Sequence, residues 1–322
     1  MNAVIHTLRL YEGGVGNMVL LDQIVHQLNR ELDIHSYGSD PGFSRFIPAV
    51  YDPLQFDWTS VFENEFAQLF NGLMLRGSAE VENVFLAVFP TEDVLTRFID
   101  ESKEGDLLFM HHPLLMECGD PNGKSGRGFV PIPDKYLLTM KKKRLSVYTC
   151  HEPLDYHQRL GTSIAIAQTL HAKIVDGFLP NEKNQNLILL CEIQKTDTDL
   201  LIETLKDKFC IPYVDFEGKQ LESIKRIAIV AGCGDKVDWM KVAERKGAQA
   251  YITGEIHCHI DNDYGRMKYN QMLEYVPNTT MSLIGVSHSA SEYLVMRTLM
   301  KSWFEDSFSI QTVLLPQEQW WL

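Results

Sequence analysis

The hydrophobic and polar residues alternate along the chain with two different periods, one typical of strands and the other of helices. Short apolar runs at 81–89, 106–110 and 145–150 predict buried strands. The segments between them, 91–103 and 134–143, predict helices, the first with acidic residues in its opening turn. This order of strand, helix and strand predicts an α/β fold with mainly parallel strands.

The same alternation begins again in the second half of the chain. Strands are predicted at 187–193, 211–216, 226–231, 250–253 and 281–287, and helices at 163–170, 197–209, 236–246 and 288–303. Proline, glycine, asparagine and lysine between 177 and 186 indicate a boundary. We therefore predict two α/β halves, residues 1–180 and 181–322, each with helices on the faces of a mixed, mainly parallel sheet.

The first 80 residues carry a weaker pattern. Residues 19–29 have apolar positions at helical spacing and predict an amphipathic helix, and residues 58–73 predict another. Residues 37–53 are rich in Gly, Ser, Asp and Pro, which predicts a loop. Further along, the glycine-rich segment 117–128 has no helical pattern and predicts a flexible lid.

Side chains that can bind metal ions follow four of the predicted strands. They are His111 and His112, His151 and Asp155, Glu255, His257 and His259, and His288 and Glu292. Because the carboxyl ends of parallel strands meet at one edge of a sheet, these side chains can converge. Imidazole and carboxylate are ordinary ligands of transition metals, and this set is large enough for two ions. The pattern predicts a metal site in the cleft at the strand carboxyl ends.

Two of these motifs, taken alone, have a simpler interpretation. His111 and His112 are also explained by two polar side chains that bond to backbone at a strand end. His288 can cap a helix, and Glu292 can be an acidic residue that the helix dipole stabilises in the first turn. A plain α/β domain with coincidental histidines is the remaining alternative, and four motifs in this order argue against it.

Composition and charge narrow the classes of function. The chain has 322 residues, with 43 acidic residues against 30 Lys and Arg and a net charge of −13. Such a surface repels phosphate backbones, so we expect no nucleic-acid partner. The six cysteines form no Cys-x-x-Cys pair, which is typical of a reduced cytoplasmic protein. The sequence has neither a secretion signal nor an apolar run of membrane-spanning length, so we expect no membrane association.

Five segments give the chain a resemblance to a known family. They are Asn71-Gly72-Leu73, Asp106 to Leu114 with its His-His-Pro-Leu ending, His151 to Asp155, Thr253-Gly254-Glu255, and His288 to Glu292. In this order they are similar to motifs of the NGG-interacting-factor-three-like proteins, also known as GTP cyclohydrolase 1 type 2 homologues. The His-His-Pro-Leu and His-x-x-x-Glu motifs are the specific ones, and the match runs from about residue 71 to the C-terminus.

The resemblance implies an α/β protein that forms a ring-shaped homohexamer and binds two divalent metal ions, with zinc, iron and manganese expected first. Glu292 would bridge the two ions, and the implied ligands are His111, His112, Asp155, His288 and Glu292. His151 and His259 fall on family histidines near the metals. We expect these two to transfer protons in catalysis or to support the ligands.

Some residues depart from the family pattern. Glu152-Pro153 stands where the family has Thr-Asn, and Ser287 stands where it often has Gly. The loop after Pro113 and the segment between His259 and His288 are longer than in the family. These departures leave the implied ligands intact but change the surroundings of the substrate pocket.

The first functional hypothesis is a metal-dependent hydrolase, in which two cations activate a water molecule. The family name implies GTP as the substrate, with opening of the purine ring, and a phosphoester would suit the same metals. The chain has no Asn-Lys-x-Asp motif for reading guanine. The alternative is a non-catalytic homohexamer that binds metal or serves as a scaffold for a partner.

Overall fold

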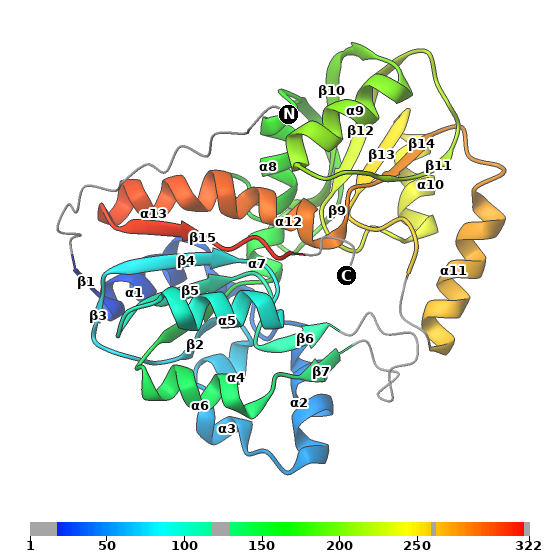
Figure 1. Ribbon diagram of the computed structural model, residues 1–322. Helices are drawn as coiled ribbons and strands as arrows, with labels where there is room; N and C mark the ends of the chain where they lie inside the picture. The colour runs from blue at the N-terminus through cyan, green and yellow to red at the C-terminus, as the bar shows by residue number, and fades with distance from the viewer. Residues whose placement is uncertain (1–17, 118–128, 259–261, 319–322) are drawn as a thin grey trace, which may run out of the picture.

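The computed structural model describes residues 18–117, 129–258 and 262–318. These residues form two large mixed sheets with helices packed on their faces (Figure 1). The fold is therefore α/β, as the alternation of strands and helices predicts. His259 lies outside the described residues, and so does nearly all of the segment predicted as a lid, 117–128.

The first sheet has five strands in the order β15-β4-β5-β8-β2. The parallel strands are β4 (Asn83–Ala87), β5 (Leu107–Met110), β8 (Ser146–Thr149) and β15 (Gln311–Leu314), with β2 (Gly72–Leu75) antiparallel to β8. Successive side chains of a strand point to opposite faces. Leu108 and Met110 accordingly join the core beneath α5 (Glu92–Glu101) and α6 (Asp134–Lys142), whereas Phe109 joins the core on the other face.

The second sheet has six strands in the order β11-β14-β13-β12-β10-β9. Its parallel centre is β12 (Ile224–Val230), β13 (Ala250–Thr253) and β14 (Ser282–Gly285). The antiparallel strands are β9 (Lys173–Pro180), β10 (Asn186–Thr196) and β11 (Asp215–Gly218). Helices α8 (Thr162–Thr169) and α9 (Thr198–Phe209) pack on one face, and α10 (Val237–Arg245) and α11 (Asp263–Tyr275) on the other.

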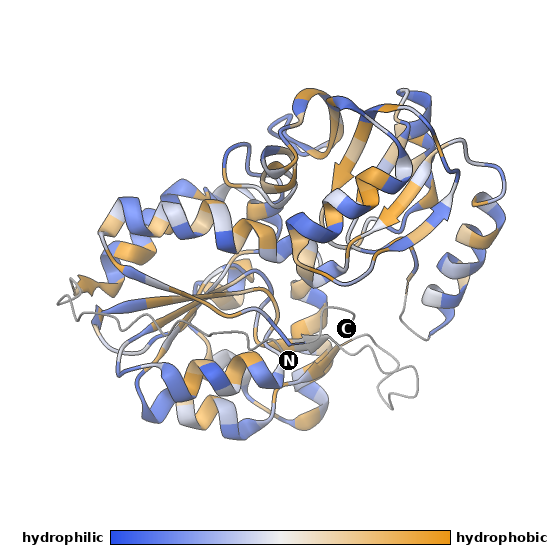
Figure 2. Ribbon diagram, turned by 45° about the horizontal axis from the view of Figure 1, so that its top comes forward, coloured by the Kyte–Doolittle hydropathy of each residue, from blue (hydrophilic) through white to orange (hydrophobic). Residues whose placement is uncertain are grey.

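A long helical segment joins the two sheets. α12 (His288–Val295) follows β14 and continues through a π-helical turn, Met296–Met300, into α13 (Lys301–Phe308). β15 then pairs with β4 in the first sheet. The ring of Phe304 on α13 packs edge-on against Phe109, with 5.5 Å between ring centroids. One hydrophobic core therefore extends across both sheets, and Figure 2 shows hydrophobic residues gathered along their strands.

The N-terminal segment differs from its prediction in two places. The predicted loop at 37–53 contains α2 (Phe43–Tyr51), because apolar side chains at helical spacing are buried on one face of it despite an internal proline. The helix predicted at 58–73 is wrong, since α3 (Trp58–Val61) and α4 (Phe66–Leu69) are separate and β2 follows. Phe70 ends α4 in a left-handed conformation, with φ of 54°, which stops the helix.

Residues 177–186, where a boundary is predicted, contain the end of β9 and the turn of a hairpin between β9 and β10. The side chain of Asn181 accepts hydrogen bonds from the backbone N–H groups of Lys183 and Gln185, both at 3.0 Å, and stabilises this turn. β9 precedes residue 180 but belongs to the second sheet, and β15 belongs to the first. The division of the chain into domains at residue 180 stays a prediction.

The remaining elements are short, apart from α1 (Leu21–Glu31), which agrees with the amphipathic helix predicted at 19–29. They are β1 (Val19–Leu20), η1 (Ile34–Ser36), η2 (Asp52–Leu54), β3 (Glu80–Val81), β6 (Leu115–Glu117), β7 (Phe129–Pro131) and α7 (Glu152–Asp155). Within the described part of the chain, no helix is both long and apolar enough to cross a membrane.

Candidate metal centre

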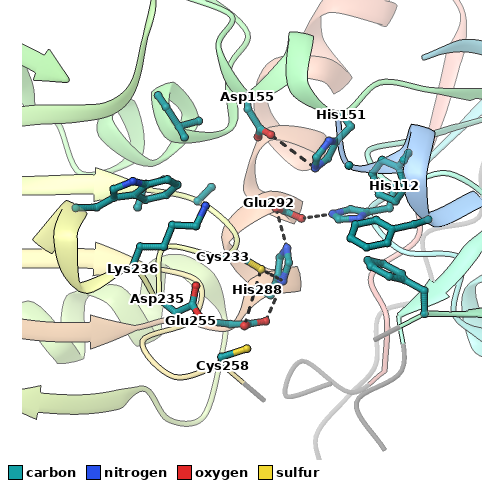
Figure 3. A pocket seen from close by; sticks show the side chains of 18 of the residues that line it. His112, His151, Asp155, Cys233, Asp235, Lys236, Glu255, Cys258, His288 and Glu292 are labelled. Atoms are coloured by element: carbon teal, nitrogen blue, oxygen red, sulfur yellow. Dashed lines mark hydrogen bonds and ion pairs between the residues drawn. The ribbon is translucent and has the colours of Figure 1, made fainter. Parts of the chain in front are cut away.

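The candidate site is built from residues that follow strands of both sheets, and these residues converge on one cavity (Figure 3). The short strands β5, β8 and β14 are buried along their whole length and contain no His, Cys, Asp or Glu, so the side chains that can bind a metal ion appear only after each strand ends. Six side chains proposed from the sequence meet here, namely His111, His112, His151, Asp155, His288 and Glu292.

Glu292 lies at the centre of this cluster. Its Oε2 is 3.0 Å from His112 Nε2, and its Oε1 is 3.0 Å from His288 Nε2 and 3.6 Å from His111 Nε2 (Figure 3). Burial disfavours the charged carboxyl group, but the neighbouring histidines outweigh this effect and hold the pKa of Glu292 well below its usual value. A buried carboxylate whose two oxygens face different imidazoles has the geometry needed to contact two cations.

His111 presents one ring nitrogen to the cluster. Its Nδ1 lies 2.8 Å from the carbonyl oxygen of Cys150. Because a carbonyl only accepts hydrogen bonds, Nδ1 carries the proton. Nε2 lies 3.4 Å from Asp155 Oδ1 and has no hydrogen-bond partner among the described residues, although it is fully buried. This orphaned nitrogen beside two carboxylates fits a metal ligand whose tautomer is fixed by the bond at its other nitrogen.

His112 sits in an aromatic environment. Its ring stacks on Phe89 with 4.1 Å between centroids and meets Phe43 edge-on at 5.6 Å. Burial lowers the pKa of His112 to about 3, although Glu292 acts in the opposite direction. His112 is therefore a neutral imidazole at physiological pH, which is the form that binds metal ions.

His151 is held by a carboxylate from the N-terminal segment. Its Nδ1 donates to Asp40 Oδ2 at 2.8 Å, and its Nε2 lies 4.0 Å from Asp155 Oδ2. Burial disfavours the protonated ring, but the carboxylates of Asp40, Asp155 and Glu292 outweigh it and raise the pKa of His151 to about 9. The backbone N–H of His151 also donates to Asn71 Oδ1 at 2.8 Å, so that both ring and backbone are fixed.

Two more strand ends reach the cluster from the second sheet. Glu255, which follows β13, has its Oε1 2.9 Å from His288 Nδ1, and Cys233, which follows β12, has its Sγ 3.4 Å from the same nitrogen. Gly232 has a φ of +69°, and a Cβ there would lie 2.3 Å from Glu292 Oε1. Glycine therefore allows the backbone after β12 to approach the carboxylate closely.

Overlapping sets of donor atoms in this cluster lie close enough together to hold a metal ion. The sets are His111, Asp155 and Glu292; His112, His288 and Glu292; His111, His112 and His151; and Cys233, Glu255 and His288. The first three contain only imidazole and carboxylate donors, which suit zinc, iron or manganese. The buried His and Glu groups could bind a metal ion, and the role of each residue as a ligand stays a prediction.

Sequence reasoning missed part of this site. Asp40 lies in the stretch that was predicted as a loop, and nothing in its local pattern connects it with the strand that ends before His151. Cys233 carried a usable signal, because Gly-Cys-Gly directly follows a predicted strand as the other ligand motifs do. In contrast, His257 is not drawn into the cluster, since its Nε2 lies 3.2 Å from Glu217 Oε1 of β11.

A cavity of about 360 Å³ opens over the cluster. Aromatic side chains line this cavity on two sides. Phe43, Phe46 and Phe129 lie on the side of the first sheet, and Trp239 and Tyr264 lie on the side of the second sheet. A lysine, Lys236, also lines the cavity, and its Nζ lies 3.7 Å from the centre of the Trp239 ring. The cavity thus joins apolar walls with a group of convergent polar side chains, as small-molecule sites usually do.

These features define an α/β protein with a buried imidazole and carboxylate cluster that could bind metal ions. A family model described as Duf34/NIF3 (NGG1p interacting factor 3) matches residues 65–319. The chain belongs to this family, which confirms the resemblance found in the sequence motifs.

Among curated relatives, the chain is similar to a GTP cyclohydrolase 1 type 2 homolog of Pyrococcus abyssi, with 25% identity over 247 residues. The match covers 76% of this chain and 88% of that protein. Another protein of the same name, from Clostridium perfringens, is 26% identical over 231 residues, which cover 70% of this chain and 79% of its own length.

Solved structures agree with the fold. Reduced HcgD from Methanocaldococcus jannaschii superposes with a TM-score of 0.60 and 15% identity, over 94% of this chain and 100% of that chain. Protein ybgI, described as of unknown function, superposes with a TM-score of 0.64 and 16% identity over the same shares. At these identities the likeness concerns the fold alone.

Proposed function

We propose that this protein binds two divalent metal ions and that Glu292 bridges them. The observation that carries the proposal is that two sets of close donor atoms share Glu292 and no other residue. Oε1 faces the ring nitrogens of His111 and His288, and Oε2 faces that of His112. His111 and Asp155 would complete the ligands of one ion, and His112 and His288 those of the other, as two of the sets of close donor atoms suggest.

The activity that this centre supports best is metal-dependent hydrolysis. Two divalent ions supply a nucleophile from water at neutral pH and stabilise developing negative charge. His151 would act as the proton donor to the leaving group. In the metal-free protein the carboxylate of Asp40 helps to raise the pKa of His151 to about 9, and its contact with Nδ1 fixes the orientation of the ring. The same role for His259 is a prediction from the sequence, because that residue lies outside the described part of the chain.

The substrate would be a small molecule, since the cavity over the cluster has a volume of about 360 Å³. GTP and phosphoesters are the first candidates. The curated relatives carry the name GTP cyclohydrolase 1 type 2 homolog, and Lys236 gives the cavity a cation that suits a phosphate group. Zinc, iron and manganese all suit the imidazole and carboxylate donors.

Steady turnover tests the catalytic proposal. Protein loaded separately with zinc, iron and manganese should be incubated with GTP and with a panel of phosphoesters, and product should be followed by chromatography. We expect multiple turnovers of at least one substrate by the native protein and a loss of at least about 100-fold in the Glu292→Ala variant. Turnover that is equal in the two proteins would contradict hydrolysis at this centre.

The alternative, a non-catalytic homohexameric scaffold, has one observation in its favour. α11 exposes large apolar side chains, including Tyr264 at 52%, Met267 at 47% and Leu273 at 50% of their surface. Such residues on one helix suit contact with another chain. Light scattering would give about six times the mass of one chain for a homohexamer, and charged replacements of Met267 and Leu273 would reduce this mass if α11 forms the contact.

A further inference from the structure

One group of potential ligand atoms is not used by the proposed pair of ions. It lies on the far side of the His288 ring, where Nδ1 faces Glu255 and Cys233 while Nε2 faces Glu292 (Figure 3). The three donors of this group come from three neighbouring strand ends, after β12, β13 and β14. A single imidazole therefore separates two groups of donor atoms.

The spacing of these donors can be compared with that of a tetrahedral zinc site. Bond lengths of about 2.3 Å to sulfur and about 2.0–2.1 Å to nitrogen and oxygen put neighbouring ligand atoms about 3.3–3.6 Å apart. Here His288 Nδ1 lies 2.9 Å from Glu255 Oε1 and 3.4 Å from Cys233 Sγ, and Cys233 Sγ lies 3.9 Å from Glu255 Oε2. The first of these distances is shorter than the expected range, the second lies within it and the third is longer. Small side-chain shifts are therefore enough to place one ion between the three groups.

The backbone that carries Cys233 is held in position by close packing. A Cβ at Gly234 would lie 2.1 Å from Thr253 Oγ1, and the N–H of Gly234 donates to this oxygen at 3.0 Å. Cys233 and Glu255 both line the cavity, as does Cys258. An ion can therefore enter from the cavity and keep a fourth coordination position open toward it, as zinc sites with three protein ligands do.

We propose that Cys233, Glu255 and His288 Nδ1 bind a third divalent ion, for which the thiolate favours zinc. The ion takes the place of the thiol proton of Cys233 and of the proton that His288 Nδ1 shares with Glu255, and both protons go to solvent. The inference goes beyond the proposed pair of ions, because it uses the one nitrogen of His288 that faces away from Glu292.

A simpler role for Glu255 is the competing explanation. A carboxylate that accepts a hydrogen bond from the second ring nitrogen of a metal-bound histidine fixes the orientation of that histidine. If Glu255 has this role, no ion is needed beside Cys233. The two explanations differ in one respect that can be measured. Only a third ion brings sulfur into the coordination of the metal, because the proposed pair has imidazole and carboxylate ligands alone.

The test is X-ray absorption at the zinc edge together with zinc content. Full-length protein should be stripped of metal, reloaded with excess zinc alone and desalted. We expect about three ions per chain and a sulfur scatterer at about 2.3 Å from zinc. Cys233→Ser should hold about one ion fewer and lose the sulfur scatterer, whereas Cys210→Ser, which changes a cysteine at the end of α9, should match the native protein.

Glu292→Ala separates this inference from the proposed function. If both are right, this variant loses the pair of ions but keeps the sulfur scatterer. Native protein whose zinc has only nitrogen and oxygen neighbours, with the same zinc content as Cys233→Ser, would overturn the third site and leave the pair standing. A sulfur scatterer that persists in Cys233→Ser would also overturn it. The spectrum of the native protein gives an answer even if a variant does not fold.

Discussion

The Oδ2 atom of Asp40 lies 2.8 Å from Nδ1 of His151, and this contact joins the N-terminal segment to the end of β8. The other oxygen of Asp40 accepts hydrogen bonds from the backbone N–H groups of Gly42 and Phe43, at 2.9 and 2.8 Å, at the start of α2. One buried carboxylate thus fixes both the beginning of a helix and the orientation of a histidine in the candidate centre.

In the metal-free protein, Asp40→Asn should lower the pKa of His151 from about 9 toward its ordinary value of 6.5. Because folding raises this pKa and lowers the pKa of Asp40, the contact contributes its full stability between about pH 3.8 and 6.5 and loses it as the pH rises through 9. The difference in unfolding free energy between the two proteins should therefore shrink as the pH rises from 6.5 to 9. Nuclear magnetic resonance of the ring protons measures the pKa, with His157 as an internal control. A His151 titration that is unchanged in the variant would contradict this account.

Gly232→Ala should remove the pair of metal ions proposed at Glu292 and leave the rest of the fold in place. The added Cβ would lie 2.3 Å from Glu292 Oε1, so the carboxylate must move out of its position between the histidines. Gly247→Ala is the matched control, because Gly247 also has a positive φ, of +82°, but its nearest neighbour is the side chain of Arg226 at 3.5 Å. We expect the first variant to hold about two metal ions per chain fewer than the native protein and the second to match the native protein. Full metal content in Gly232→Ala would show that Glu292 is not required where we place it.

Ser287→Gly should stabilise the protein. Ser287 precedes α12 with φ of 72°, a conformation that costs a residue with a Cβ about 1 kcal/mol or more. Its side chain accepts from the N–H of Ala290 at 3.3 Å, and glycine replaces such a cap at a cost of only a few tenths of a kcal/mol. Chemical denaturation should show that the free energy of unfolding rises by about 1 kcal/mol in Ser287→Gly. It should fall by about 1 kcal/mol in Ser287→Ala, because alanine keeps the backbone strain and loses the cap. Lower stability of both variants would contradict this prediction, because it would mean that the interactions of the serine side chain stabilise the protein by more than the backbone strain destabilises it.

The parts of the fold that could be predicted are those whose pattern is local. The strands that end before His111, His151 and His288 are short, buried and followed within three residues by a histidine, and the helices between them have regular apolar spacing. The same local signal located the clustered histidines and carboxylates. The α/β class and the meeting of these side chains followed from the rule that parallel strands present their carboxyl ends at one edge.

The parts that could not be predicted depend on contacts between distant residues. Asp40 reaches His151 across 111 positions of sequence, and no periodicity records such a contact. The turn near Asn181 has the composition of a domain boundary, yet only the pairing of β9 with β10 shows that it is a hairpin. β15 joins the first sheet through its pairing with β4, more than 200 residues away, which a local pattern does not contain.

The central claim is that Glu292 holds two metal ions between the two groups of histidines. Metal content of the native protein, Glu292→Ala and Glu203→Ala, measured by plasma mass spectrometry after equal loading, tests it most directly. Glu203 lies on α9, on the exposed side, and serves as the control for loss of one carboxylate. The account predicts that the native protein and Glu203→Ala each hold about two ions per chain more than Glu292→Ala. Equal metal content in all three proteins, or a native protein that takes up no metal, would contradict it.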